Sequence, residues 1–398
     1  MTTAAAEGAK PKPGGRRAAL PPWTEKAIAP AFLLLAAMLP FFFDSGSSFI
    51  EDCTLALAYV VMALGLNIIV GFAGLLDLGY VAFFAIGAFT MGYMGSLFVS
   101  SADLHILVSG AAENLRGIHV NFIFVLVVAV IATTIAGMLI GLPTLRLRGD
   151  YIAIVTLAFG EIIGRVFANG DEVTIFGDNK LSNGRQSISP IDQINLPIFG
   201  EFDSALNLRP YYWTALALCL VVLFVNFRLR DSRLGRAWIA LREDEVAAAS
   251  MGVPLVKTKL LSYAAGGAFG GISGAFLGPV YASVNANQFQ FGFSIFILAM
   301  VILGGLGSIW GVVLGAIALG FLNHWFIPDV LDGEFVRERL DSFGLNFSFS
   351  EVSFGVFGFL LLLMMVLRPE GLIPERRHKL ELAEAAGAVD ESIYEARV

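Results

Sequence analysis

Charged residues are scarce in this chain. Asp, Glu, Lys and Arg make up 15% of its 398 residues, whereas 57% are hydrophobic and the mean hydropathy is +0.75. Soluble domains carry about 25% charged residues. The deficit excludes an ordinary soluble domain and predicts an all-α integral membrane protein.

Cysteine, histidine and catalytic motifs are also few. Cys53 and Cys219 lie far apart, which excludes a disulfide framework and a cysteine-based metal site. The four histidines form no HExxH motif, and the sequence contains neither a GxxxxGK[ST] phosphate loop nor a GxSxG motif. We therefore expect no metal, no cofactor and no catalytic residue on this chain. No cluster of residues supports the alternatives of an enzyme or a scaffold.

Long apolar runs, in contrast, are abundant. Several are shorter than the ~20 residues needed to cross ~30 Å of hydrocarbon, which is more typical of channels and transporters than of simple anchors. We predict ten membrane spans, near residues 27–43, 53–70, 80–98, 120–141, 151–168, 211–227, 257–281, 293–307, 309–326 and 352–367.

The basic residues predict the orientation of these spans. With the N-terminus inside, most of the 26 Lys and Arg residues fall in the tails or in the 142–150 and 228–256 loops, so both termini are expected in the cytoplasm. Residues 1–26 are polar and basic and are expected to form a disordered tail, not a cleaved signal peptide. The transmembrane domain then covers 27–367, followed by a cytoplasmic tail at 368–398. The external segments 169–210 and 327–351 are either docking surfaces for a partner or solvated loops.

A glycine-spaced break joins the second and third predicted spans at residues 71–79. It carries one carboxylate, Asp77, and Asn67 precedes it within the apolar run. Non-helical backbone at membrane depth survives only where protein or water covers it, so the break is either the wall or hinge of a pathway or a tight loop between helices. The candidate pathway or hinge residues are Asn67, Gly71, Gly74, Asp77, Gly79, Tyr80, Phe83 and Phe84.

Two further patterns lie inside the spans. Glu161 and Arg165 are four residues apart, the spacing at which helix side chains meet; they form either a neutralising pair near the outer helix end or part of a gate or polar lining. Small residues at i and i+4 allow helix backbones to approach closely, which predicts a tightly packed bundle. The glycines expected to serve this packing are Gly266, Gly270, Gly274, Gly278, Gly307 and Gly311.

Residues 234–252 form the most specific element outside the membrane. Their Ala, Leu, Glu and Arg content predicts one helix, ended by Gly252 with Pro254 beyond. An apolar stripe that includes Trp238 lies opposite a charged ridge. Such a helix suits a groove on a partner protein, the alternative being an amphipathic helix on the membrane surface. The candidate contact residues are Arg236, Trp238, Arg242, Glu243, Asp244, Glu245 and Gly252.

With these segments placed, the chain resembles the M-type (LivM-like) membrane permease subunits of ABC importers for branched-chain amino acids. The resemblance covers roughly residues 55–375. It rests on long motifs in order: ALGLN at 63–67, GFAGLLDLGY at 71–80, LRLRGDY at 145–151, AIVTLAFGE at 153–161, GRA at 235–237, REDE at 242–245, GGLGSIWG at 304–311 and RPEG at 368–371.

The resemblance implies a type II importer fold in the bacterial inner membrane. It also implies a second, homologous H-type permease, two cytoplasmic ATPases that hold ATP and Mg, and a periplasmic substrate-binding protein. Residues 234–252 resemble the coupling helix that docks on an ATPase. Related permeases carry urea or short amides, so these substrates stay open as an alternative. A self-contained secondary transporter also stays open, but it leaves the 234–252 helix unexplained.

Overall fold

The computed structural model describes residues 34–99, 102–108, 115–145, 147, 149–174, 180–196, 200–202, 207–332, 352–368 and 371–373. The predicted 1–26 tail, nearly all of the C-terminal tail and most of the 327–351 segment lie outside these residues. The chain divides into two units, Met1–Asp44 and Ser45–Val398. The described part of the first unit contains the short 3-10 helix η1 (Leu39–Phe41), and everything below concerns the second unit.

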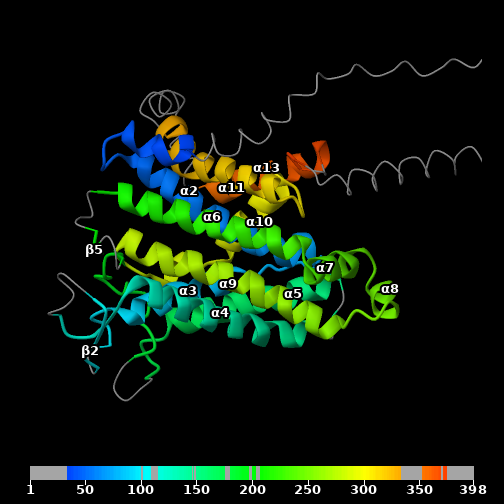
Figure 1. Cartoon of the computed structure of the whole chain (residues 1–398), viewed down its shortest axis with the longest axis horizontal. Helices are drawn as coiled ribbons and strands as arrows, with labels where there is room; N and C mark the ends of the chain where they lie inside the picture. Colours follow the sequence, from blue (N-terminus) through cyan, green and yellow to red (C-terminus); the bar gives the residue numbers. More distant parts are fainter. Residues whose placement is uncertain are drawn as a thin grey trace, which may run out of the picture. The chain divides into compact units, whose positions relative to one another are not determined.

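Helices dominate the second unit (Figure 1). Six are long and apolar enough to cross a membrane, and three apolar helices are shorter. Each coincides with a predicted span, whereas residues 27–33 of the first predicted span, 27–43, lie outside the described residues. The helices are α2 (Ser48–Leu66), α3 (Val81–Met94), α4 (Phe122–Thr144), α5 (Asp150–Ala168), α6 (Arg209–Asp231), α7 (Arg233–Glu243), α8 (Glu245–Ser250), α9 (Leu255–Tyr281), α10 (Phe291–Gly304), α11 (Ile309–Phe321) and α13 (Ser353–Leu367), with the π-helices η2 (Asn67–Phe72) and η5 (Leu322–Leu331) and the 3-10 helix η4 (Ala286–Gln288).

The centre of the bundle consists of α2, α3 and α9. The segment Ser48–Phe72 is buried along almost its whole length, and α9 packs against α2, α3 and α4. In Figure 1, α9 runs between α6 on one side and α3 and α4 on the other. By contrast, at most 28% of the apolar stretch of each of α4, α5 and α6 is buried inside the structure. A helix that is apolar on its outer face as well suits lipid or another membrane protein.

Short strands gather where α3 ends. β1 (Gly95–Ser96) pairs antiparallel with β3 (Ile118–Val120), which pairs in parallel with β2 (Leu104–Ile106); β4 (Asn195–Leu196) and β5 (Gly200–Glu201) form a second small sheet. Single bridges connect Ser96 to Ile191 and Ile188 to Val284. The predicted external segment 169–210 is therefore tied, in its described part, to the connection between α9 and α10.

Candidate functional site

The helix break is narrower than the sequence predicts. The chain stays helical through η2 and unwinds only at residues 73–80, so Gly71 belongs to the π-helix and not to the break. A π-turn widens the helix and often marks a functional position. Asn67 stabilises this π-helix, because its Oδ1 accepts a hydrogen bond of 2.9 Å from the backbone N–H of Gly307.

Side chains from two other helices hold the unwound backbone. Thr156 of α5 accepts a hydrogen bond from Leu78 N at 3.1 Å, and Ser294 of α10 accepts one from Val81 N at 3.1 Å. Asp77 turns back on its own segment and accepts from Gly79 N at 2.8 Å. These bonds supply the partners that buried, non-helical backbone requires.

Packing explains most of the other predicted pathway residues. A Cβ on Gly79 would lie 1.9 Å from the Thr156 carbonyl oxygen, so only glycine fits there. Tyr80 is fully buried and donates from its hydroxyl to Gly266 O at 2.9 Å, and Phe83 is buried beside it. Among the predicted pathway residues, Phe84 is the one that lines the cavity described below.

The predicted helix over 234–252 is two helices, and the prediction of one was wrong. Asp244 leaves helical geometry at φ −155° and ψ 114° and separates α7 from α8. Its Oδ1 accepts from Val246 N at 2.7 Å and Ala247 N at 3.0 Å, so it caps the start of α8. Gly252 follows α8 at φ +84°, as expected of a residue that ends a helix.

The predicted charged ridge is also only partly exposed. Arg242 reaches inward and donates from Nη1 to Gly71 O at 2.6 Å. Glu245 forms an ion pair of 2.7 Å with Lys259 of α9, whose side chain is 3% exposed. Glu243 and Arg236 remain exposed.

Trp238 anchors α7 to the bundle. It is fully buried, and its Nε1 donates to Thr258 O of α9 at 2.9 Å. The apolar residues that α8 and its C-terminal end present outward are Val246 and Met251, which are 66% and 86% exposed. The α7–α8 segment is therefore fixed to η2 and α9 on one side and offers a small apolar surface on the other.

The glycines of the predicted packing stripe lie against neighbouring backbone or side chains. Gly266 meets α2 at Gly65 O, and Gly274 meets α3 at Phe84 O, each closer than a Cβ would allow. Gly270 faces the Tyr80 and Phe83 side chains, and Gly278 faces Met91. Gly311 packs on Gly304 O, while Gly307 sits at φ +85° beside η2. In lipid, where the hydrophobic effect does not bring helices together, close helix contacts of this kind stabilise the bundle.

Glu161 and Arg165 form an ion pair of 3.6 Å on α5. Both side chains face outward, since Arg165 is 81% exposed and Glu161 is 44% exposed. The pair lines a groove with Arg185 and with residues 286, 287 and 289–292.

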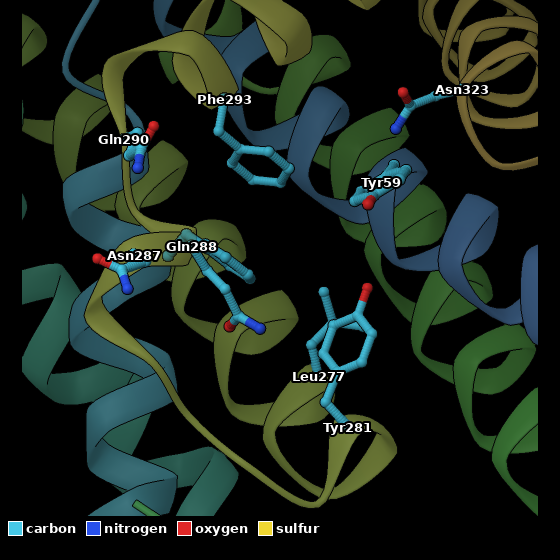
Figure 2. Close-up of a pocket in the computed structure, with 9 residues that line it drawn as sticks. Tyr59, Leu277, Tyr281, Asn287, Gln288, Gln290, Phe293 and Asn323 are labelled. Atoms are coloured by element: carbon cyan, nitrogen blue, oxygen red, sulfur yellow. The ribbon is translucent and has the colours of Figure 1, made fainter. Parts of the chain in front are cut away.

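A cavity of 280 Å³ opens on the other side of residues 286–290 (Figure 2). Figure 2 shows Gln288 reaching into it, with Tyr59, Tyr281 and Phe293 on the other walls. Tyr59 shares a hydrogen bond of 2.8 Å with His324. None of the residues that line it carries a carboxylate, ammonium or guanidinium group: Tyr59, Phe84, Leu277, Tyr281, Asn287, Gln288, Gln290, Phe293 and Asn323.

Sequence reasoning missed this cavity. Its walls come from α2 and α3, from the consecutive elements α9, η4 and α10, and from η5, three regions that are distant in the chain. A local signal existed, because Asn287, Gln288 and Gln290 place three amides within four residues of an otherwise apolar region. Side-chain amides at membrane depth call for polar partners or water.

Membrane-length helices, a fixed internal break and a short helix pair bonded to the π-helix before that break define a multi-pass membrane permease. The chain belongs to the family of permease components of branched-chain amino acid transport systems, whose model matches residues 50–367. This membership disfavours the self-contained secondary transporter and supports a transport component without enzymatic activity.

Several proteins of this family are similar to the chain. The high-affinity branched-chain amino acid transport system permease protein LivM of Escherichia coli K12 is 34% identical over 91% of this chain and 78% of its own length. The probable LivM of Methanocaldococcus jannaschii is 27% identical over 80% and 91%. The permease protein LivH of Salmonella typhimurium is 29% identical over 43% of this chain and 48% of its own length. No solved structure gives a significant match.

Proposed function

We propose that this chain is the M-type permease subunit of an ATP-driven importer for branched-chain amino acids in a bacterial inner membrane. It has ten spans and both termini in the cytoplasm. The observation that carries the proposal is the 34% identity to a LivM permease over 91% of the chain. The alternative substrates, urea and short amides, have no support among these relatives.

The partners follow from the same class. A homologous H-type permease completes the translocation pathway, and the similarity to LivH supports that pairing. Two cytoplasmic ATPases bind ATP and Mg, and a periplasmic binding protein delivers the amino acid. This chain itself needs no cofactor.

The α7–α8 segment is the contact for an ATPase. Val246 and Met251 offer apolar side chains that fit a groove on a partner, and Glu243 adds a charge beside them. Arg242 and Trp238 transmit the movement of this segment to η2 and α9. The break at 73–80 then shifts as the pathway alternates between outward and inward openings.

Reconstitution tests the proposal directly. This chain is purified with the H-type permease and ATPases encoded by the same genome and placed in liposomes with the binding protein. We expect uptake of radiolabelled leucine, isoleucine and valine that requires hydrolysable ATP on the side of the ATPases. Uptake that proceeds without ATP, or uptake of urea in preference to leucine, contradicts it.

A further inference from the structure

The cavity of Figure 2 combines apolar walls with one polar wall, and none of the described residues that line it is charged. Phe84, Leu277 and Phe293 form the apolar walls and come from α3, α9 and α10. The polar wall is η4 with the residues beside it, from which the amide of Gln288 reaches into the hollow. Its 280 Å³ lies just below the ~300–1,000 Å³ of pockets for drug-sized ligands, so one small molecule fits.

Contacts on both sides of η4 fix the polar wall in place. Val284, two residues before η4, exchanges backbone hydrogen bonds of 2.9 and 3.1 Å with Ile188 of the predicted external segment. Phe289, directly after η4, is buried, and its ring centroid lies 5.3 Å from that of Phe84. A ligand that contacts Gln288 therefore contacts a wall that is already in position, which lowers the entropic cost of binding.

The wall opposite η4 is fixed as well. The hydroxyl of Tyr59 on α2 shares a hydrogen bond of 2.8 Å with His324 Nε2. The Tyr59 ring lies edge-on to the rings of Phe293 and Phe296, at centroid distances of 5.8 and 5.7 Å. The aromatic side of the cavity thus has a defined shape, which allows it to discriminate between side chains by their fit.

The uncharged lining favours a ligand without net charge. A primary amide has two N–H donors and a carbonyl acceptor, so Gln288 can donate to a carboxylate or accept from an ammonium group. Within the described residues, no hydrogen bond engages its side chain. A ligand with a net charge would find no counter-charge in the described lining, and burial of an unpaired charge is costly. The cavity therefore suits a neutral zwitterion with an apolar side chain better than lysine or glutamate.

We propose that this cavity is a low-affinity site for one zwitterionic amino acid with an apolar side chain. The amide of Gln288 contacts the polar end of the ligand, and Phe84, Leu277 and Phe293 contact its side chain. The inference rests on the proposed function, to which it adds a substrate contact within this subunit and selection against net charge in the permease itself. Weak binding suits a pathway, because the ligand must leave again.

Protection of an introduced thiol tests the site. Asn323→Cys places a thiol on the cavity wall, whereas the native Cys53 and Cys219 are buried, so the unchanged chain gives the background. The assembled permease and ATPase complex, in nanodiscs without binding protein or nucleotide, is labelled with a small maleimide at increasing concentrations of amino acid. Leucine, isoleucine and valine should slow the labelling in a saturable way, and lysine and glutamate should not.

Variants of Gln288 identify the polar contact. Gln288→Leu should raise the leucine concentration needed for half-protection about tenfold, because it removes a hydrogen bond to a charged group of the ligand. Gln288→Glu supplies a counter-charge and should allow lysine to protect the thiol. The matched control is Gln186→Leu, at an exposed glutamine that does not line the cavity, and it should leave protection by leucine unchanged.

Two further reporters separate binding in the cavity from a general change of shape. Arg185→Cys places a thiol in the groove beside Glu161 and Arg165, and it should be labelled equally with and without leucine. Tyr281→Cys reports on the same cavity if the first reporter variant does not assemble. The site is wrong if leucine does not protect a thiol on the cavity wall, or if leucine, lysine and glutamate protect it equally.

ATP-driven uptake by wild-type liposomes tells the two proposals apart. If these liposomes import leucine while leucine fails to protect the cavity thiol, the site falls and the proposed function stands. If the complete assembly imports no branched-chain amino acid, the proposed function falls and the site falls with it.

Discussion

Arg242 of α7 donates a 2.6 Å hydrogen bond from Nη1 to the carbonyl oxygen of Gly71, 171 residues away. This bond joins the proposed ATPase contact to the π-helix that precedes the break. Gly74, at φ +70°, lies so close that its built Cβ would be 2.7 Å from Arg242 Cγ. The two segments therefore form one mechanical unit.

Replacing Arg242 should uncouple transport from ATP hydrolysis. Arg242→Gln removes the charged donor to Gly71 O while the Trp238 anchor remains, so we expect assembly of the complex, continued ATP hydrolysis and at least tenfold less leucine uptake. The measurement is uptake and ATP hydrolysis in the same liposomes. Arg233→Gln, an exposed position on the same helix outside the candidate contact residues, is the control and should keep the wild-type ratio.

Variants at two glycines distinguish the effect of backbone strain on transport from the effect of steric contact. Gly74→Ala forces a left-handed residue, at about 1 to 2 kcal/mol, and also places a methyl group against Arg242. Gly252→Ala has similar strain at φ +84° but nothing within 4 Å. We expect Gly74→Ala to reduce uptake and Gly74→Leu to abolish it, while both variants still insert and assemble. Gly252→Ala should leave uptake unchanged. Normal uptake by Gly74→Leu, or an equal loss in Gly252→Ala, would rule out a special role for the contact with Arg242.

The ion pair between Glu245 and Lys259 should behave as a structural pair. Glu245→Gln leaves the buried ammonium group unpaired, which costs about 3 kcal/mol of unfolding free energy, the low end of the usual range because Glu245 is 30% exposed. Glu245→Gln with Lys259→Met should recover most of the loss. Thermal unfolding of the single and double variants gives the coupling energy, and additive losses would mean that the pair contributes nothing.

The small apolar surface formed by Val246 and Met251 should dock the ATPase. Val246→Asp with Met251→Asp should abolish co-purification of the ATPases without changing the thermal stability of the permease pair, because both side chains are exposed. Glu243→Lys should weaken it to a smaller extent. Reversing the charge of Asp244 or Glu245 is a poor test of docking, because Asp244 caps α8 and Glu245 pairs with Lys259. Full ATPase recovery with both aspartates present would place the contact elsewhere.

Local patterns in the sequence predicted the helices and the position of the break, because apolar length and glycine spacing are local properties. They could not predict that Asp244 divides the 234–252 segment, since Ala, Glu and Arg around it all favour helix. Nor could they predict that Glu245 turns toward Lys259, or that Tyr59 and Phe293 share a cavity. Those contacts depend on how α2, α9 and α10 pack, which no single segment specifies.

The most direct test of the importer assignment is affinity purification of this chain from its native membrane, with identification of the proteins that accompany it. We expect a second permease of the same family and two ATPases that contain the phosphate-binding loop absent from this sequence. A chain that purifies alone and moves amino acids into liposomes without ATP would contradict it.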